Sequence, residues 1–154
     1  MDDQSAFTQL DSFFQRSVCQ KAGAPLREDI EIGIQTDTNH TFSLIKNQGK
    51  LSLLRNSPSA PDLTFFLGSK STEALSDIES DDIGEIGVTV LGLMLEQAKD
   101  YRISAKIHTH PITLFRKGYM GVLALGGSPV LSFLAKKGIG NLSSIKAAFL
   151  KLKE

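Results

Sequence analysis

Four short segments between residues 29 and 67 alternate apolar and polar side chains, and turn sequences separate them. The first, DIEIGIQTD, places Ile30, Ile32 and Ile34 on one face, and TFSLIK, LSLLR and DLTFFLG repeat the alternation around the turns NQGK and SPSAP. A period of two gives each strand one apolar face. Because short turns join antiparallel neighbours, the pattern predicts a four-stranded antiparallel meander.

Helical spacing of apolar residues precedes and follows the meander. The stretch 88–95 is apolar almost all round, so its helix is expected to be deeply buried or to line a cavity. Its three neighbouring glycines either allow close packing or loosen the helix. We expect helices, capped at Ser71 or Thr72 and at Ser128, over residues 5–21, 71–75, 83–95, 129–137 and 141–154. ITLFRKG predicts a helical turn, and YRISAKIHT and YMGVLAL predict two more short strands.

The length of 154 residues suits a single domain over 1–154. The lone Cys19 cannot form an intramolecular disulfide, and the start of the chain lacks the pattern of a signal peptide, so a cytoplasmic protein is expected. Charge is distributed unevenly along the chain. Residues 1–100 hold 16 acidic and 8 basic residues, whereas residues 101–154 hold one acidic and nine basic residues. The basic third suggests an anionic partner such as a membrane surface, or simply neutralisation within the fold.

His108 and His110 are expected to share one face of a strand, where both could reach a zinc ion. The sequence HTHP also resembles the His-x-His-Pro of the JAMM metallopeptidases. The Asp that those enzymes supply downstream is missing, because no Asp follows Asp100. His40 has no feature that marks it as a third ligand. We therefore expect no metal site, and two histidines on the solvent side of a strand.

Other chemical motifs are weak. Cys19 lies beside the apolar stripe of the first helix, which favours a buried structural role. The glycines of GGSP lead into a helix, where they either make a tight turn or leave backbone amides for an anion. The lysines of the last helix lack aromatic interleaving, so no nucleic-acid partner is expected. We expect no catalytic residue and no cofactor.

Two segments carry a family resemblance. PDLTFFLGSKSTEALSD (61–77) resembles the part of sterol carrier protein 2 (SCP-2)-like domains where a strand leads into a helix that begins with Ser or Thr. ITLFRKGYMGVLALGGSPVLSFL (112–134) resembles the late signature of that family, with Gly118 and Gly126 at its glycines and Gly127 where Asp is usual. The resemblance covers about residues 5–138, and the segment 79–110 departs from the family's spacing.

The resemblance implies an α+β fold with a mostly antiparallel sheet of five strands, or six if 101–109 adds one, covered by helices around an apolar tunnel. It implies non-catalytic binding or transfer of a lipid: a fatty acid, acyl-CoA, sterol-like or quinone-type ligand. The alternatives are a zinc-dependent hydrolase that uses the His-Thr-His segment and a protein-interaction module. Apolar patterning and the resemblance together give these lining candidates: Leu91, Met94, Leu95, Phe115, Val122, Leu131 and Phe133.

Overall fold

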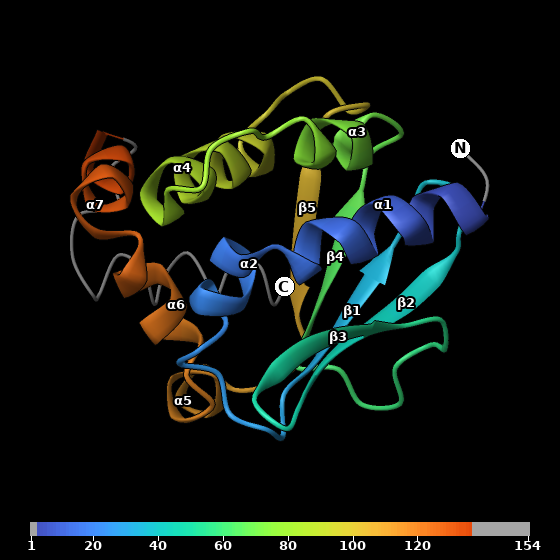
Figure 1. Cartoon of the computed structure of the whole chain (residues 1–154), viewed down its shortest axis with the longest axis horizontal. Helices are drawn as coiled ribbons and strands as arrows, with labels where there is room; N and C mark the ends of the chain where they lie inside the picture. Colours follow the sequence, from blue (N-terminus) through green and yellow to red (C-terminus); the bar gives the residue numbers. More distant parts are fainter. Residues whose placement is uncertain (1–2, 137–154) are drawn as a thin grey trace.

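The strands form one five-stranded sheet in the order β3-β2-β1-β4-β5 (Figure 1). The computed structural model describes residues 3–136, apart from the side chains of Ser128, Leu131, Leu134 and Ala135. All neighbouring strands are antiparallel except β1 and β4, which are parallel. The strands are β1 (Glu31–Gln35), β2 (Thr41–Asn47), β3 (Lys50–Leu54), β4 (Leu63–Leu67) and β5 (Ile103–Ile107).

The parallel pairing of β1 with β4 corrects the predicted four-stranded meander, which holds only for β1 to β3. The segment after β3 crosses the outer face of the sheet instead of turning back beside it. A Cβ built on Gly33 of β1 would lie 3.2 Å from Pro58 Cγ in this crossing segment and 2.8 Å from Thr64 Oγ1 of β4. Glycine is therefore required for the crossing segment and β4 to approach β1.

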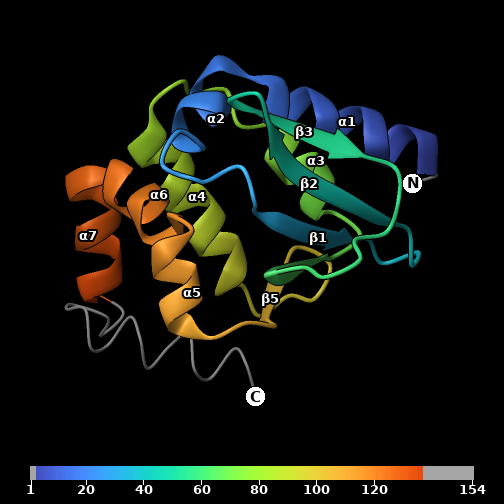
Figure 2. The same cartoon turned by 90° about the horizontal axis from the view of Figure 1, so that it is seen from below.

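The inner face of the sheet and the helices share one core. Apolar residues of alternate positions, such as Ile34, Phe42 and Leu44, meet Leu10 and Phe13 of α1. Figure 2 shows α5, α6 and α7 grouped beside α4 at one side of the molecule. Among residues 3–136, no helix is long and apolar enough to cross a membrane. The helices are α1 (Asp3–Gln15), α2 (Ser17–Ala22), α3 (Ser71–Ser76), α4 (Ile83–Met94), α5 (Pro111–Arg116), α6 (Tyr119–Leu125) and α7 (Gly127–Lys136).

The helix predicted for residues 5–21 is two helices, because Arg16 leaves the helical conformation with φ −58° and ψ 140°. Its guanidinium donates to the carbonyls of Ile78 and Ser80 at 2.7 and 2.6 Å and to Asp81 at 2.9 Å. The break thus lets Arg16 hydrogen-bond to the backbone carbonyls of the segment that precedes α4. A local apolar period contains no information about such a distant partner.

The segment YMGVLAL, predicted to be a strand, is helix α6. A short apolar run does not distinguish a strand from a helix. Gly118 precedes it with φ 95°, and a Cβ there would lie 2.0 Å from the carbonyl oxygen of Pro25. Only glycine fits this position, and its left-handed conformation starts the new helix directly after α5.

Two of the predicted caps are wrong. Lys70, not Ser71 or Thr72, is the N-cap of α3. Ser71 instead accepts the amide of Gly68 and donates to the carbonyl of Arg102, joining β4 to β5 at their ends. Helix α7 begins at Gly127, one residue before the predicted cap Ser128. The predicted helix over 141–154 lies outside the described residues.

Helices α4 and α7 pack closely through glycine. A Cβ on Gly84 would lie 2.8 Å from the carbonyl oxygen of Gly126, and one on Gly87 would lie 2.9 Å from Val130 Cγ2. Gly92, by contrast, has open space around its Cα. Two of the three glycines therefore allow close packing. The expectation of a deeply buried helix is wrong for residues 88–95, which are half-buried or exposed.

Candidate functional site

Helix α2, the start of α4, the end of α6 and the start of α7 lie together at one side of the molecule (Figure 1). A hollow of about 390 Å³ is lined by residues of these four elements. It is open to solvent, and we call it the apolar hollow. Six of its lining residues are apolar or glycine, and the other three are charged and exposed. The lining residues are Val18, Lys21, Asp81, Asp82, Ile83, Gly84, Leu125, Gly126 and Pro129.

Backbone geometry builds one wall of the apolar hollow. The Asp82 carboxylate caps α4 by accepting the amide of Glu85 at 3.0 Å, which fixes where the helix starts. Gly84 then meets Gly126 and Pro129, whose Cγ would lie 3.0 Å from a Cβ at Gly84. The close approach of α4 and α7 leaves Leu125 at the edge of the hollow with 43% of its surface exposed.

The residues that the structure describes leave apolar surface of helix α6 uncovered. This helix contains no charged residue, yet none of its seven residues is buried. A helix that is apolar all round is normally buried. Exposed apolar surface next to a hollow is typical of a ligand-binding or partner-binding site. In α4, too, the apolar residues after Gly87 are only half-buried, and Val90, Leu93 and Met94 among them pack against the core.

The predicted lining residues lie on or next to α4, α5, α6 and α7, and none of them lines the hollow. Met94 and Val122 pack against the core, and Leu95 lies just after α4 with 50% of its surface exposed. Leu91, Phe115 and Phe133 are half-buried. The backbone of Leu131 belongs to α7, while its side chain is outside the description. On α4 and α7 the predicted positions lie further along the helix than the residues that form the hollow, whereas Val122 precedes Leu125 on α6 and Phe115 lies on α5.

The second hollow, of about 450 Å³, is polar. Its two lysines are already engaged inside the protein. Lys46 donates to three carbonyls between α2 and β1, at 2.7 to 3.1 Å, and Lys117 donates to the carbonyl of Asp29 at 3.1 Å. This polar hollow is lined by Glu28, Asp29, Ile30, Glu31, Ile45, Lys46, Asn47, Ser59, Ala60 and Lys117.

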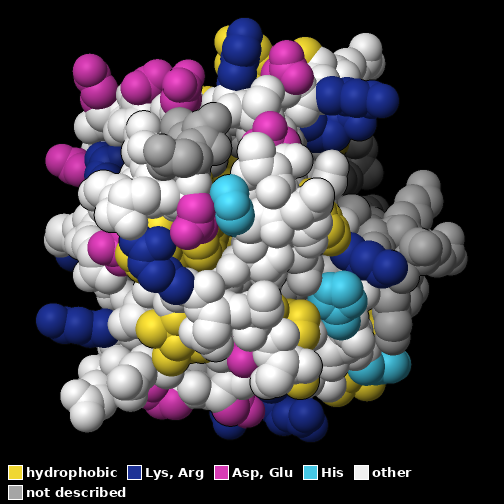
Figure 3. All heavy atoms as spheres, turned by 90° about the vertical axis from the view of Figure 1, so that its right-hand side faces the viewer, with side chains coloured by type: hydrophobic (Ala, Val, Ile, Leu, Met, Phe, Trp, Pro, Cys, Tyr) yellow, Lys and Arg dark blue, Asp and Glu magenta, His cyan; other side chains and the backbone are white. Residues whose placement is uncertain are grey.

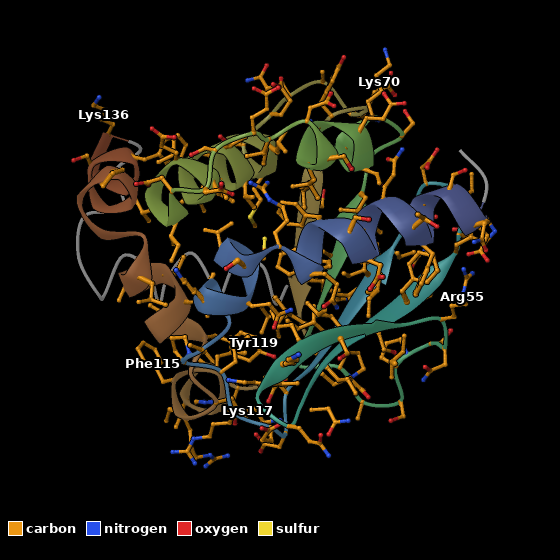
Figure 4. The ribbon with its side chains drawn as sticks, viewed as in Figure 1. Arg55, Lys70, Phe115, Lys117, Tyr119 and Lys136 are labelled. Atoms are coloured by element: carbon orange, nitrogen blue, oxygen red, sulfur yellow. The ribbon has the colours of Figure 1, made fainter. Side chains whose placement is uncertain are left out.

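Asp62 is the centre of a buried polar cluster, which the sequence patterns did not predict. Its buried carboxylate accepts from Lys117 Nζ at 2.9 Å, from the Tyr119 hydroxyl at 2.8 Å and from the amide of Glu31 at 3.1 Å. Lys117 and Tyr119 lie in the same part of the molecule (Figure 4). Burial, together with the hydrogen bond to Asp62, raises the pKa of Tyr119. The cluster fastens the α5–α6 segment to the sheet.

The histidines do not form a metal site among the described residues. His108 follows β5 directly, and its Nε2 lies 2.9 Å from Thr64 Oγ1. The strand ends at Ile107, so the expectation that His110 shares its face is wrong. His110 instead caps α5 by accepting the amide of Ile112 at 3.1 Å. Among the described residues, no group of three His, Cys, Asp or Glu side chains could hold a metal ion. Figure 3 shows histidines at the molecular surface, with hydrophobic side chains also visible there.

Cys19 is buried, as its position on the first helix predicted. Burial raises the pKa of its thiol, and the neighbouring Arg16 lowers it by less. The thiol is therefore poorly suited to act as a nucleophile.

Comparison of the chain with protein-family models, with curated proteins and with solved structures finds no match. The candidate site consequently stands on geometry alone. The apolar hollow has exposed apolar surface beside it. In the polar hollow, by contrast, Lys46 and Lys117 are hydrogen-bonded to backbone carbonyls of the protein.

Proposed function

We propose that this chain binds a small hydrophobic ligand, without changing it chemically, in the apolar hollow. The observation that carries the proposal is the uncovered apolar surface of α6 next to a hollow of about 390 Å³. Ligand sites are typically concave, of roughly 300–1,000 Å³, and mostly apolar with a few polar groups. The α+β fold with a five-stranded sheet is compatible with the SCP-2 resemblance and supports the same class of ligand.

The ligand's tail is expected to follow the helices away from the hollow. Met94, Val122 and Phe133 lie on α4, α6 and α7, which meet at the hollow, so a longer ligand would reach the predicted lining residues. In this proposal, α4, α6 and α7 form an SCP-2-like tunnel when the ligand is bound. The basic third of the chain would then bring the protein to an anionic membrane surface, from which a lipid is taken.

The zinc-hydrolase alternative has no comparable support, because His110 is engaged as a helix cap. The interaction-module alternative would use the same α6 surface. A ligand and a protein partner differ in what they need: a small molecule must fill the hollow, and a partner needs only the surface.

The test is a titration with N-phenyl-1-naphthylamine, a neutral apolar probe whose fluorescence increases in apolar surroundings. We expect saturable binding that Leu125→Ala weakens up to about tenfold, since a buried leucine is worth about 1.5–3 kcal/mol and Leu125 has 43% of its surface left to cover. Leu54→Ala is the matched control, because Leu54 is 37% exposed on β3, away from the hollow. Equal effects of the two substitutions would contradict the site.

Met94→Trp measures how far the ligand reaches. Normal binding of the probe with weakened binding of a long-chain ligand would place the tail along α4. Native mass spectrometry of the purified protein, with solvent extraction, identifies a lipid that copurifies. Stoichiometric zinc with no bound lipid would contradict the proposal.

A further inference from the structure

Helix α4 has an apolar stripe on a different side from the one that meets the core. Its core side includes Ile86 and packs against the core through residues such as Val90. Val88, Leu91 and Leu95 follow one another at spacings of three and four, so they lie along one line of the helix surface. Val88 and Leu91 are half-buried, and Leu95 is 50% exposed. We call these three residues the open stripe of α4.

The chain beyond the described helices starts within reach of this stripe. Helix α7 meets Gly87 of α4 at Val130, and it ends at Lys136, six residues later. Residues 137–140, if extended, span about 13 Å at roughly 3.3 Å per residue. A helix over residues 141–154 would be about 21 Å long, at 1.5 Å per residue, and the open stripe is about 10 Å long. The segment 141–154 is therefore long enough to cover the stripe from end to end.

This segment has an apolar pattern that needs a partner. Its apolar residues recur at spacings of three and four, which predicts an amphipathic helix with one apolar face. A helix of this length is marginal in water, because most helical stability comes from packing of the apolar face. The open stripe of α4 is an apolar helix surface of the same chain against which such a face can pack. The apolar residues of the segment are Leu142, Ile145, Phe149 and Leu152.

Charge favours a contact within the chain as well. Residues 137–154 hold four lysines and one glutamate, out of 17 basic and 17 acidic residues in all, so residues 1–136 hold 13 basic and 16 acidic residues. A segment of net positive charge is attracted to a body of net negative charge. This attraction does not select a place on the surface, whereas the apolar match does.

We propose that residues 141–154 fold back as a helix over the open stripe of α4 in the same molecule. A long ligand whose tail follows α4 has to displace this helix, so the segment regulates access to the site. The regulation rests on the proposed function, because it requires a ligand tail along α4. The packing of the segment on the stripe does not depend on any ligand.

Alkylation of a thiol in the stripe tests the packing in the full chain. Val88→Cys places the thiol there, and its rate of reaction with iodoacetamide measures how often the stripe is uncovered. Ile145→Ser combined with Phe149→Ser should increase this rate about tenfold or more, since two buried apolar side chains are lost. Leu150→Ser, which lies off the apolar face, is the matched control and should leave the rate within about twofold. The buried Cys19 gives the background rate.

A thiol far from α4 separates uncovering of the stripe from general loosening. Leu54→Cys lies on β3, away from α4 (Figure 1), and its alkylation rate should not respond to the Ile145 and Phe149 substitutions. An unchanged rate at Val88→Cys, or an equal increase at Leu54→Cys or with Leu150→Ser, would overturn the inference. Protection of Val88→Cys that increases with protein concentration would make a second copy the cover and would also overturn it. Protection that needs phosphatidylglycerol vesicles would do the same in favour of a membrane.

Binding of 1-dodecanol tests the regulation. In competition with N-phenyl-1-naphthylamine, 1-dodecanol should bind the chain with Ile145→Ser and Phe149→Ser about threefold or more tighter than the unchanged chain, whereas the short probe should bind both equally. Equal affinities of the two chains for 1-dodecanol would overturn the regulation. If alkylation changes as expected and neither compound binds, the proposed function fails together with the regulation, and the packing stands.

Discussion

The side-chain amide of Gln20 binds the backbone of Leu51 as a neighbouring strand would. Its Oε1 accepts the Leu51 amide at 2.9 Å, and its Nε2 donates to the Leu51 carbonyl at 3.1 Å. Leu51 lies on β3, one of the two edge strands, with its backbone N–H and C=O directed away from β2. The side chain of α2 thereby satisfies an edge that would otherwise be open to pairing with another chain.

Gln20→Ala should therefore lower the free energy of unfolding by about 1–3 kcal/mol, the cost of leaving partly buried backbone groups unpaired. Gln20→Glu should cost at least as much, because a carboxylate cannot donate to the Leu51 carbonyl. Urea denaturation measures both. Gln97→Ala, at an exposed residue, is the control. An unchanged midpoint for both Gln20 variants would show that the contact contributes nothing to stability.

The two glycines of α4 should respond to alanine in opposite directions. Gly92→Ala adds a methyl group into open space and should stabilise the protein by up to about 1 kcal/mol through helix propensity. Gly87→Ala should destabilise it, because the new Cβ would lie 2.9 Å from Val130 Cγ2 and push α7 from α4. Thermal unfolding of the pair measures this, and a gain of stability for Gly87→Ala would contradict the described packing.

Lys117→Met should be strongly destabilising. It leaves the Asp62 carboxylate, whose side chain is 5% exposed, without its ionic partner, and breaking a buried pair costs about 3–5 kcal/mol. Adding Asp62→Asn to Lys117→Met should recover part of this loss, because the unpaired charge is then removed. Lys106→Met, at an exposed position, is the control. Equal denaturation midpoints for the Lys117 and Lys106 variants would exclude a stabilising role for the pair.

Stability should fall as the pH rises above about 10. The pKa of Tyr119 is raised in the folded state, so the unfolded chain loses this proton first, near the ordinary tyrosine pKa of about 10. Above that pH the folded state binds more protons than the unfolded state, so the free energy of unfolding decreases as the pH rises. Tyr119→Phe should flatten the decline between pH 9 and 11, whereas Tyr101→Phe, at an exposed residue, should not. Cys19 contributes in the same direction in both variants.

Most local elements of this fold could be predicted from the sequence, apart from α6 and the break at Arg16, and the distant pairings could not. Alternation and the turn at Gln48 and Gly49, both with positive φ, identify β2 and β3 as a hairpin. The neighbour of β4 depends instead on Gly33, which lets the chain cross over β1. Nothing near Gly33 in the sequence indicates which strand will lie beside it.

The candidate site shows the same limit. Apolar spacing predicted the helices that became α4 and α7, but it predicted a strand where α6 lies. The position of the hollow also depends on how Gly84 meets Gly126, which follows it by 42 residues. Asp62 gave no signal either, because its partners Lys117 and Tyr119 follow 55 and 57 residues later. A buried carboxylate is recognised only when the fold brings donors to it.

The parallel pairing of β1 and β4 also orders events in time. Strands β1 to β3 are joined by short turns, so they are expected to pair as soon as residues 31–54 have left the ribosome. Strand β4 has to wait, because its first contact, between Glu31 and Asp62, closes a loop across 31 residues. We therefore expect β1 to β3 to form first and β4 with β5 to dock later as a second unit.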